Sequence, residues 1–158
     1  MIYIGIDPGK KGAIAFTDGY GAFVHDMPLD ADGRIDAQGL MLLMSSKILS
    51  SSKSMCFVEK AQAMPGQGVT SVFNYGVGYG VIRAVLQISC IPFQEIHPMK
   101  WKKEFTLIKK DKADSVAIAR QLFPHAPLVR DKKGGGEILL DGRAEALLIC
   151  EYCRRQTK

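Results

Sequence analysis

Apolar and polar positions alternate in short runs near the N-terminus. Residues 2–7 and roughly 12–17 have the alternating pattern of strands, with a turn between them. Asp18-Gly19 is a hairpin signal and is followed by a third predicted strand at about 22–27. The chain is therefore predicted to open with a three-stranded antiparallel meander.

After the meander, helical and extended patterns alternate. The predicted elements are helices at 36–49, 69–89, 111–123 and 141–155, strands ending at Glu59 and at 96, a basic helix or turn at 97–105, and a loop at 132–136. Asp111 is a plausible N-cap with Asp114 three residues on. This order predicts an α/β fold with one mixed sheet flanked by helices, in a single domain over residues 1–158.

Composition limits the protein class. A chain of 158 residues with 47% hydrophobic and 23% charged residues is typical of a soluble domain with a substantial core. No apolar run approaches the roughly 20 residues needed to cross a bilayer, so no membrane partner is expected. The N-terminus enters a strand pattern directly, which argues against secretion and favours a cytoplasmic location.

Four cysteines fit a reducing compartment better than a disulfide framework. Cys56 and Cys90 lie in apolar runs. Cys150 and Cys153 form a C-x-x-C inside a predicted helix, without the second pair that a zinc site needs. A zinc site is therefore not expected.

The positive charge is concentrated in one segment. The net charge is +5, and residues 100–133 alone carry ten basic and four acidic side chains. Such a segment favours a polyanionic partner, nucleic acid being the commonest, although a merely solvated basic face is the alternative.

Four acidic residues carry the candidate chemistry. Asp7 and Glu59 end two apolar strands, and Asp141 and Glu145 lie four apart at the start of the last helix, hence on one helix face. Converging carboxylates repel each other unless a divalent cation lies between them. A helix docked on the sheet would build a site for two magnesium ions about 3.5–4 Å apart. Taken singly, Asp7 is equally explained as a cap of the Pro8-Gly9 turn, and a role as helix N-cap is an alternative for Asp141.

Ordered motifs resemble a known family. They are Ile4-Gly-Ile-Asp-Pro-Gly9, Phe57-Val-Glu59, Tyr79-Gly-Val-Ile-Arg-Ala-Val85, the basic run from Pro98 through Trp101-Lys102 and Asp111-Lys112 to Pro124, and Asp141-Gly-Arg-Ala-Glu-Ala-Leu147. In this order the chain resembles the RuvC-like Holliday junction resolvases of the ribonuclease H-like superfamily. The resemblance implies a ribonuclease H-like mixed five-stranded sheet, in a bacterial cell or a phage-infected host.

The resemblance also implies an activity. Members are crossover junction endodeoxyribonucleases, homodimers that cut four-way DNA junctions by paired symmetrical nicks with two Mg²⁺ per active site; Mn²⁺ is expected to substitute. Asp7, Glu59, Asp141 and Glu145 would be the metal ligands, and Lys112 would stabilise the transition state. The cellular enzymes space their last two site residues three apart and end on Asp, so the role of Asp141 stays open.

The expected DNA contacts follow from the same segments. They comprise Lys60, Gln62, Met64, Lys100, Trp101, Lys102, Lys103, Lys109, Lys110, Lys132 and Lys133. Gln62 and Met64 stand where cellular members carry an aromatic wedge. Trp101 either stacks on a base or belongs to the core, and Arg143 forms either a pair within its helix or a phosphate contact. A broader fork and flap nuclease, and a non-catalytic binder of branched DNA, are the alternative functions.

Overall fold

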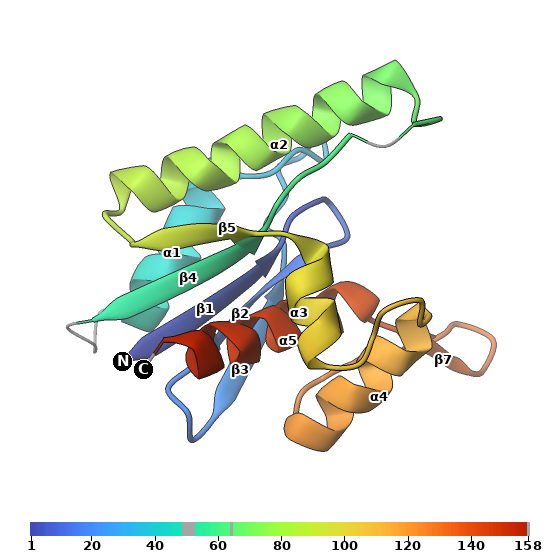
Figure 1. The fold of residues 1–158 in the computed structure, drawn as a ribbon. Helices are drawn as coiled ribbons and strands as arrows, with labels where there is room; N and C mark the ends of the chain where they lie inside the picture. The colour runs from blue at the N-terminus through green and yellow to red at the C-terminus, as the bar shows by residue number, and fades with distance from the viewer. Residues whose placement is uncertain (49–52, 64, 158) are drawn as a thin grey trace.

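The computed structural model describes residues 1–48, 53–63 and 65–157, and its centre is one five-stranded sheet (Figure 1). The strands run in the order β3-β2-β1-β4-β5. Their bounds are β1 Ile2–Asp7, β2 Ala13–Thr17, β3 Ala22–Asp26, β4 Ser54–Glu59 and β5 Phe93–Ile96. β1, β2 and β3 form the predicted antiparallel meander, whereas β4 and β5 add in parallel to β1. The predicted mixed sheet is confirmed.

Helices cover both faces of this sheet (Figure 1). α1 and α2 lie on one face, and α3, α4 and α5 lie on the other. Their bounds are α1 Ala37–Ile48, α2 Val69–Ile88, α3 Pro98–Glu104, α4 Lys112–Leu122 and α5 Asp141–Gln156. None of the helices in the described part of the chain is both long and apolar enough to cross a lipid bilayer.

Strand alternation divides the buried side chains between two cores. Ile4 and Ile6 of β1 pack with α1 and α2, together with Cys56 and Val58 of β4. The intervening positions face α5, because successive side chains of a strand point to opposite faces. Phe57 accordingly belongs to the α5 core. Asp7 and Glu59 have the same parity as Gly5 and Phe57, so the strand-end acids point to the α5 side.

Helix α5 crosses β1 at unusually close range. A Cβ placed on Gly5 would overlap the backbone of Ala146 and Cys150, and one on Gly142 would overlap the Lys11 carbonyl. Only glycine permits a helix backbone to approach a strand or turn this closely. The contact at Gly5 determines how close α5 lies to the sheet. The contact at Gly142 positions the first turn of α5.

Local sequence signals account for several element boundaries. Asp111 caps α4 through a capping box in which Asp111 and Asp114 bind each other's backbone N–H groups, as predicted. The sequence predicts only a loop at 132–136. In the structure these residues are the turn of a hairpin between β6 (Val129–Asp131) and β7 (Glu137–Leu139). Three-residue strands carry too little periodicity to be seen in a sequence.

The C-x-x-C cysteines have structural partners. The thiols of Cys150 and Cys153 donate to the carbonyls of Tyr3 and Met55, at 3.1 and 3.5 Å, so they tie α5 to β1 and β4. Burial raises the pKa of the Cys153 thiol to about 11. Such thiols remain protonated at neutral pH and are poor metal ligands.

Gly5→Ala tests the close approach of α5. The added methyl group overlaps backbone that has no rotamer to change, so we expect a loss of about 1–3 kcal/mol in the free energy of unfolding, measured by urea denaturation. Gly21→Ala is the matched control, because a Cβ there meets no atom within 4 Å and the glycine does not have a positive φ. The free energy of unfolding of the control should stay within about 0.5 kcal/mol of wild type. Equal effects of the two changes would contradict the proposed packing.

Candidate active site

The first two acids stand side by side at the carboxyl ends of β1 and β4. The strands are parallel neighbours, and Ile6 pairs with Val58 immediately before Asp7 and Glu59. The turn after Asp7 is closed by backbone, since the Gly12 N–H donates to the Gly9 carbonyl at 3.1 Å. Asp7 is therefore not needed to cap that turn.

The last two acids come from the first turns of α5. The N-cap of α5 is Leu140, and Asp141 is the first helical residue. The alternative that Asp141 merely caps the helix is therefore wrong. Like Asp7 and Glu59, Asp141 and Glu145 are partly buried, so all four retain access to solvent.

Neighbouring carboxylates affect the protonation of Asp7 and Glu145. Burial raises the pKa of Asp7 well above its ordinary value, and the charges of Glu145, Glu59 and Asp141 raise it further. Burial also raises the pKa of Glu145, with additional contributions from Glu59 and Asp141. A group whose charge is opposed by burial and by three like charges stands at the centre of the cluster. The sequence-predicted acids are thus brought together.

Two lysines partly neutralise the cluster. The Lys112 ammonium, in the first turn of α4, donates to Asp141, and this bond raises the pKa of Lys112. The Lys102 ammonium of α3 lies 3.8 Å from Glu145 Oε1. The basic segment therefore contacts the acids directly, which sequence reasoning expected for Lys112 and not for Lys102.

Trp101 corrects one predicted DNA contact. Its side chain has no exposed surface, and its indole Nε1–H donates to Glu59 Oε2 at 2.7 Å. A buried ring with a satisfied N–H is not available to stack on a base. The structure supports the alternative that Trp101 belongs to the core. The sequence did not predict its hydrogen bond to Glu59.

The acids suit a divalent cation by donor type. Mg²⁺ is bound through carboxylate oxygens, and Asp7, Glu59, Asp141 and Glu145 supply them from three neighbouring elements. Within the described residues, no group of three or more His, Cys, Asp or Glu side chains is arranged to hold a metal ion. Three of the carboxylates instead contact Trp101, Lys112 and Lys102.

Most of the other predicted DNA contacts are exposed. α3, α4, α5 and the β6–β7 hairpin lie on the same side of the sheet as the acids (Figure 1). The exposed residues are Lys60, Gln62, Lys100, Lys103, Lys109, Lys110, Lys132 and Lys133. Met64 lies outside the described residues. We call the exposed lysines of α3, of the segment before α4 and of the hairpin turn the basic surface, because their elements lie on the side of the sheet that carries the acids.

Arg143 has a structural role. Its guanidinium binds both carboxylate oxygens of Asp26, at 2.5 and 2.8 Å, and donates to the Pro127 carbonyl at 3.0 Å. This bidentate pair also lowers the pKa of Asp26. It ties the start of α5 to β3 and to the segment before β6, so the predicted pair within the helix is wrong and the partner of Arg143 is on a strand.

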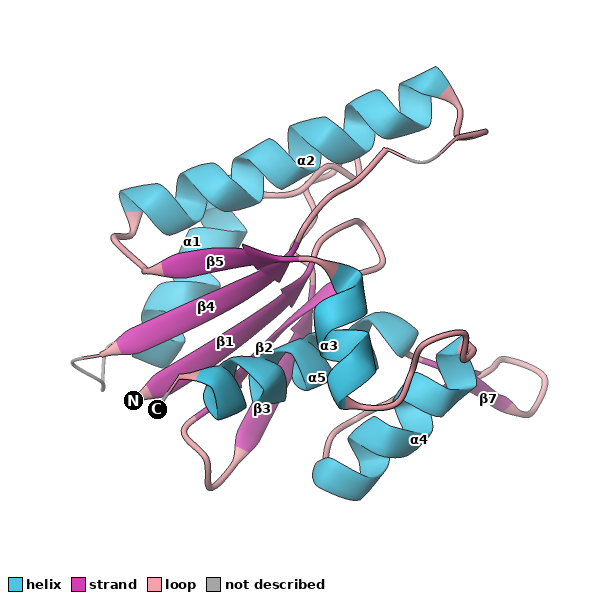
Figure 2. Cartoon of the chain, viewed as in Figure 1, coloured by secondary structure: helices cyan, strands magenta, loops and turns pink. Residues whose placement is uncertain are grey.

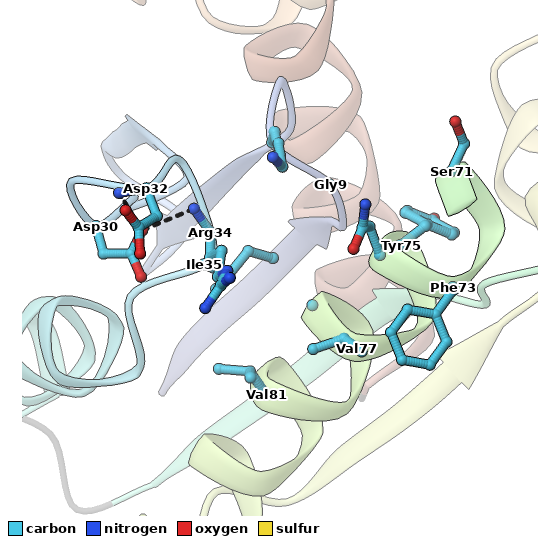
Figure 3. Close-up of a pocket in the computed structure, with 13 residues that line it drawn as sticks. Gly9, Asp30, Asp32, Arg34, Ile35, Ser71, Phe73, Tyr75, Val77 and Val81 are labelled. Carbon is cyan, nitrogen blue, oxygen red and sulfur yellow. Dashed lines mark hydrogen bonds between the residues drawn. The ribbon is translucent and has the colours of Figure 1, made fainter.

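Sequence reasoning missed Tyr75 and an adjacent cleft. Burial raises the pKa of the Tyr75 phenol to about 12, with contributions from the nearby Asp7 and Glu59 charges. The cleft of about 700 Å³ lies between α2, the β1–β2 turn and the 30–35 segment, with Tyr75 and Gly9 on its wall (Figure 3). No motif marks it, because three segments distant in the sequence form it.

Comparisons with known proteins support the fold. No protein-family model and no curated protein matches this sequence. Among solved structures, RuvC from Thermus thermophilus in complex with a Holliday junction substrate aligns with a TM-score of 0.60 and 13% identity, over 99% of this chain and 97% of that one. Another structure of Thermus thermophilus RuvC gives 0.56 and 16%, over 99% and 98%. The chain therefore has a RuvC-like, ribonuclease H-like fold.

Asp7→Asn tests the electrostatic cost of the cluster. The pKa of Asp7 is raised in the folded protein, so its ionised form opposes folding above that pKa. In metal-free buffer at neutral pH we expect the variant to melt higher by about 2–4 °C, the shift that about 1 kcal/mol gives in a chain of this size. The difference should shrink as pH falls through the raised pKa, because wild-type Asp7 then becomes neutral.

The matched control for this change is Asp32→Asn at an exposed position. Its melting temperature should follow wild type across the same pH range. A lower melting temperature for Asp7→Asn at neutral pH would contradict the like-charge cluster.

Proposed function

We propose that the protein is a Mg²⁺-dependent endonuclease that resolves four-way DNA junctions by paired symmetrical nicks. The observation that carries the proposal is the partly buried cluster of Asp7, Glu59, Asp141 and Glu145, set beside a lysine-rich surface. The similarity of the fold to a RuvC captured with a Holliday junction supports the choice of substrate.

The residues divide the work of phosphodiester hydrolysis. Asp7, Glu59 and Glu145 would hold two Mg²⁺, with Asp141 as the fourth acid. When bound, the ions would activate water and stabilise the leaving 3′ oxygen. Lys112 stands beside the acids on α4, where its ammonium would stabilise charge on the scissile phosphate. No side chain is required as a general base.

The basic surface would position the junction. Lysines bind phosphate oxygens without reading sequence, and they fix the register of the DNA relative to the acids. Lys100 and Lys103 of α3 and Lys109 and Lys110 before α4 are exposed on this side. Lys132 and Lys133 in the hairpin turn would extend the contact along one arm of the junction.

Helix α2 offers the surface for a homodimer, which paired cutting requires. It carries an exposed stripe of apolar or small residues at helical spacing, namely Val69, Phe73, Gly76, Gly80 and Ala84. A Cβ placed on Gly76 or Gly80 would meet no atom within 4 Å. Exposed glycines in a helix lower its stability, and they allow the helix of a second copy to approach closely.

The decisive experiment is cleavage of a labelled four-way junction, with linear duplex and flap substrates in parallel and with Mg²⁺ or EDTA. We expect symmetrical nicks on the junction alone, absent in EDTA. Asp7→Asn and Glu59→Gln should each slow cutting by more than the roughly 10–100-fold that changes behind a metal ligand cause. Asp32→Asn is the matched control and should cut at the wild-type rate.

Other outcomes discriminate the alternatives. Comparable cutting of flaps and junctions would replace the junction resolvase with a broader branched-DNA nuclease. Binding of junctions in Mg²⁺ without any nick, under conditions where the protein is folded, would leave a non-catalytic DNA binder.

The basic surface has its own test. Because Lys102 is paired with Glu145, the informative change is Lys100→Ala with Lys103→Ala. Each lost phosphate contact should lower the slope of log K against log salt by about 0.9, so the double variant should lose nearly 2 units. Lys47→Ala with Lys53→Ala removes the same charge from residues that are not part of this surface. An unchanged slope for the α3 variant would remove α3 from the DNA interface.

A further inference from the structure

Helix α3 contacts the acid cluster through a neutral hydrogen bond as well as through a lysine. Figure 2 shows α3 at the end of the sheet where β4 and β5 finish. From this helix the Trp101 indole Nε1–H reaches Glu59 Oε2 at 2.7 Å, although the two residues are 42 positions apart. The neighbouring Lys102 ammonium lies 5.1 Å from the centroid of the Trp101 ring and 3.8 Å from Glu145 Oε1.

The geometry restricts what Glu59 can do. An indole has one polar hydrogen, and a fully buried indole must place it on an acceptor. Here the acceptor is one oxygen of a carboxylate at the strand end, while the ring is held rigidly by the core around Leu107, Val116 and Leu147. The bond therefore restrains the torsion of the Glu59 carboxylate through its Oε2 atom.

A neutral donor suits this role better than a lysine would. An ammonium group on Glu59 would cancel its charge and compete with a cation for both oxygens. An indole N–H orients the carboxylate and leaves its negative charge in place. Hydrogen bonds to a metal-ligating carboxylate, donated by residues that do not contact the metal, are a general means of raising metal affinity.

We infer that Trp101 is a positioning residue that orients Glu59 for divalent-cation binding, and that its indole reports the occupancy of the site. The inference rests on the proposed function for the identity of the ion. Trp101 is the only tryptophan in the chain, so both its emission and its indole N–H resonance are unique signals.

The test uses the full-length protein without DNA, titrated with Mg²⁺ alone. The indole N–H cross-peak of the wild-type protein should shift saturably, with the same midpoint that calorimetry gives for Mg²⁺ binding. In Glu59→Gln the metal-dependent shift should disappear. Glu137→Gln, an exposed acid on β7, is the matched control and should keep the wild-type response. If the indole N–H resonance of the wild-type protein does not shift at saturating Mg²⁺, the inference is overturned. This outcome requires no substitution of Trp101.

Trp101→Phe removes the donor and keeps most of the ring volume. We expect its Mg²⁺ dissociation constant to rise by about tenfold or more, while its affinity for a four-way junction in EDTA stays within about twofold of wild type. Wild-type Mg²⁺ affinity in a folded Trp101→Phe protein would overturn the inference. A loss of junction binding in EDTA would also overturn it, because it would mean that Trp101 contacts DNA.

The two proposals fail in different ways. Wild-type cutting by Trp101→Phe across a Mg²⁺ titration would remove the positioning role and leave the nuclease standing. A Mg²⁺-responsive indole in a protein that cuts no DNA would remove the nuclease and leave the positioning role standing.

Discussion

The approach of α5 to β1 over Gly5 is the contact on which the candidate site depends. The two strand-end acids are already neighbours through the parallel pairing of β1 and β4, but two carboxylates do not make the cluster. The other two arrive only because α5 lies directly on the strand, with its first turn seated against the Lys11 carbonyl. Arg143 holds the same turn from the other side through Asp26. Packing of glycine against backbone therefore determines an electrostatic arrangement.

That arrangement places like charges close together at a cost in stability. The raised pKa of Asp7 expresses the cost, since burial and three carboxylates all oppose its ionisation. Lys102 of α3 and Lys112 of α4 offset part of this repulsion, because their ammonium groups lie beside Glu145 and Asp141. Hydrophobic side chains at the same positions would fold at lower cost, so such a cluster is typical of a functional site rather than of a stabilising one.

The sequence predicted the elements better than the contacts between their side chains. Strand and helix patterns identified the sheet, and Asp111 with Asp114 identified the start of α4. The convergence of the four acids also followed, because strand ends and helix faces are properties of periodicity. The β6–β7 hairpin could not be predicted, because a strand of three residues is too short to show a periodic pattern in the sequence.

The hydrogen-bond partners of individual side chains could not be predicted from the sequence, for a different reason. Trp101 and Glu59 are 42 positions apart, and Arg143 and Asp26 are 117 apart. Which donor meets which acceptor depends on the height and tilt of α3 and α5 above the sheet, and these are set by tertiary packing. Tyr75 is the same case, because a helix pattern does not say which residue faces a strand end on a neighbouring layer.

The weak sequence identity to solved structures sharpens the functional argument. At 13–16% identity a shared fold says little about chemistry, because one fold hosts many activities. Support for a nuclease therefore comes from the residues of this chain. They separate into two sides: α2 carries the apolar stripe and one wall of the cleft, whereas the face of the sheet covered by α3, α4 and α5 holds the acids and the exposed lysines. Under the proposed function, the α2 stripe would contact the second copy and the charged surface would contact DNA, which is the division that a dimeric enzyme acting on two DNA strands would need.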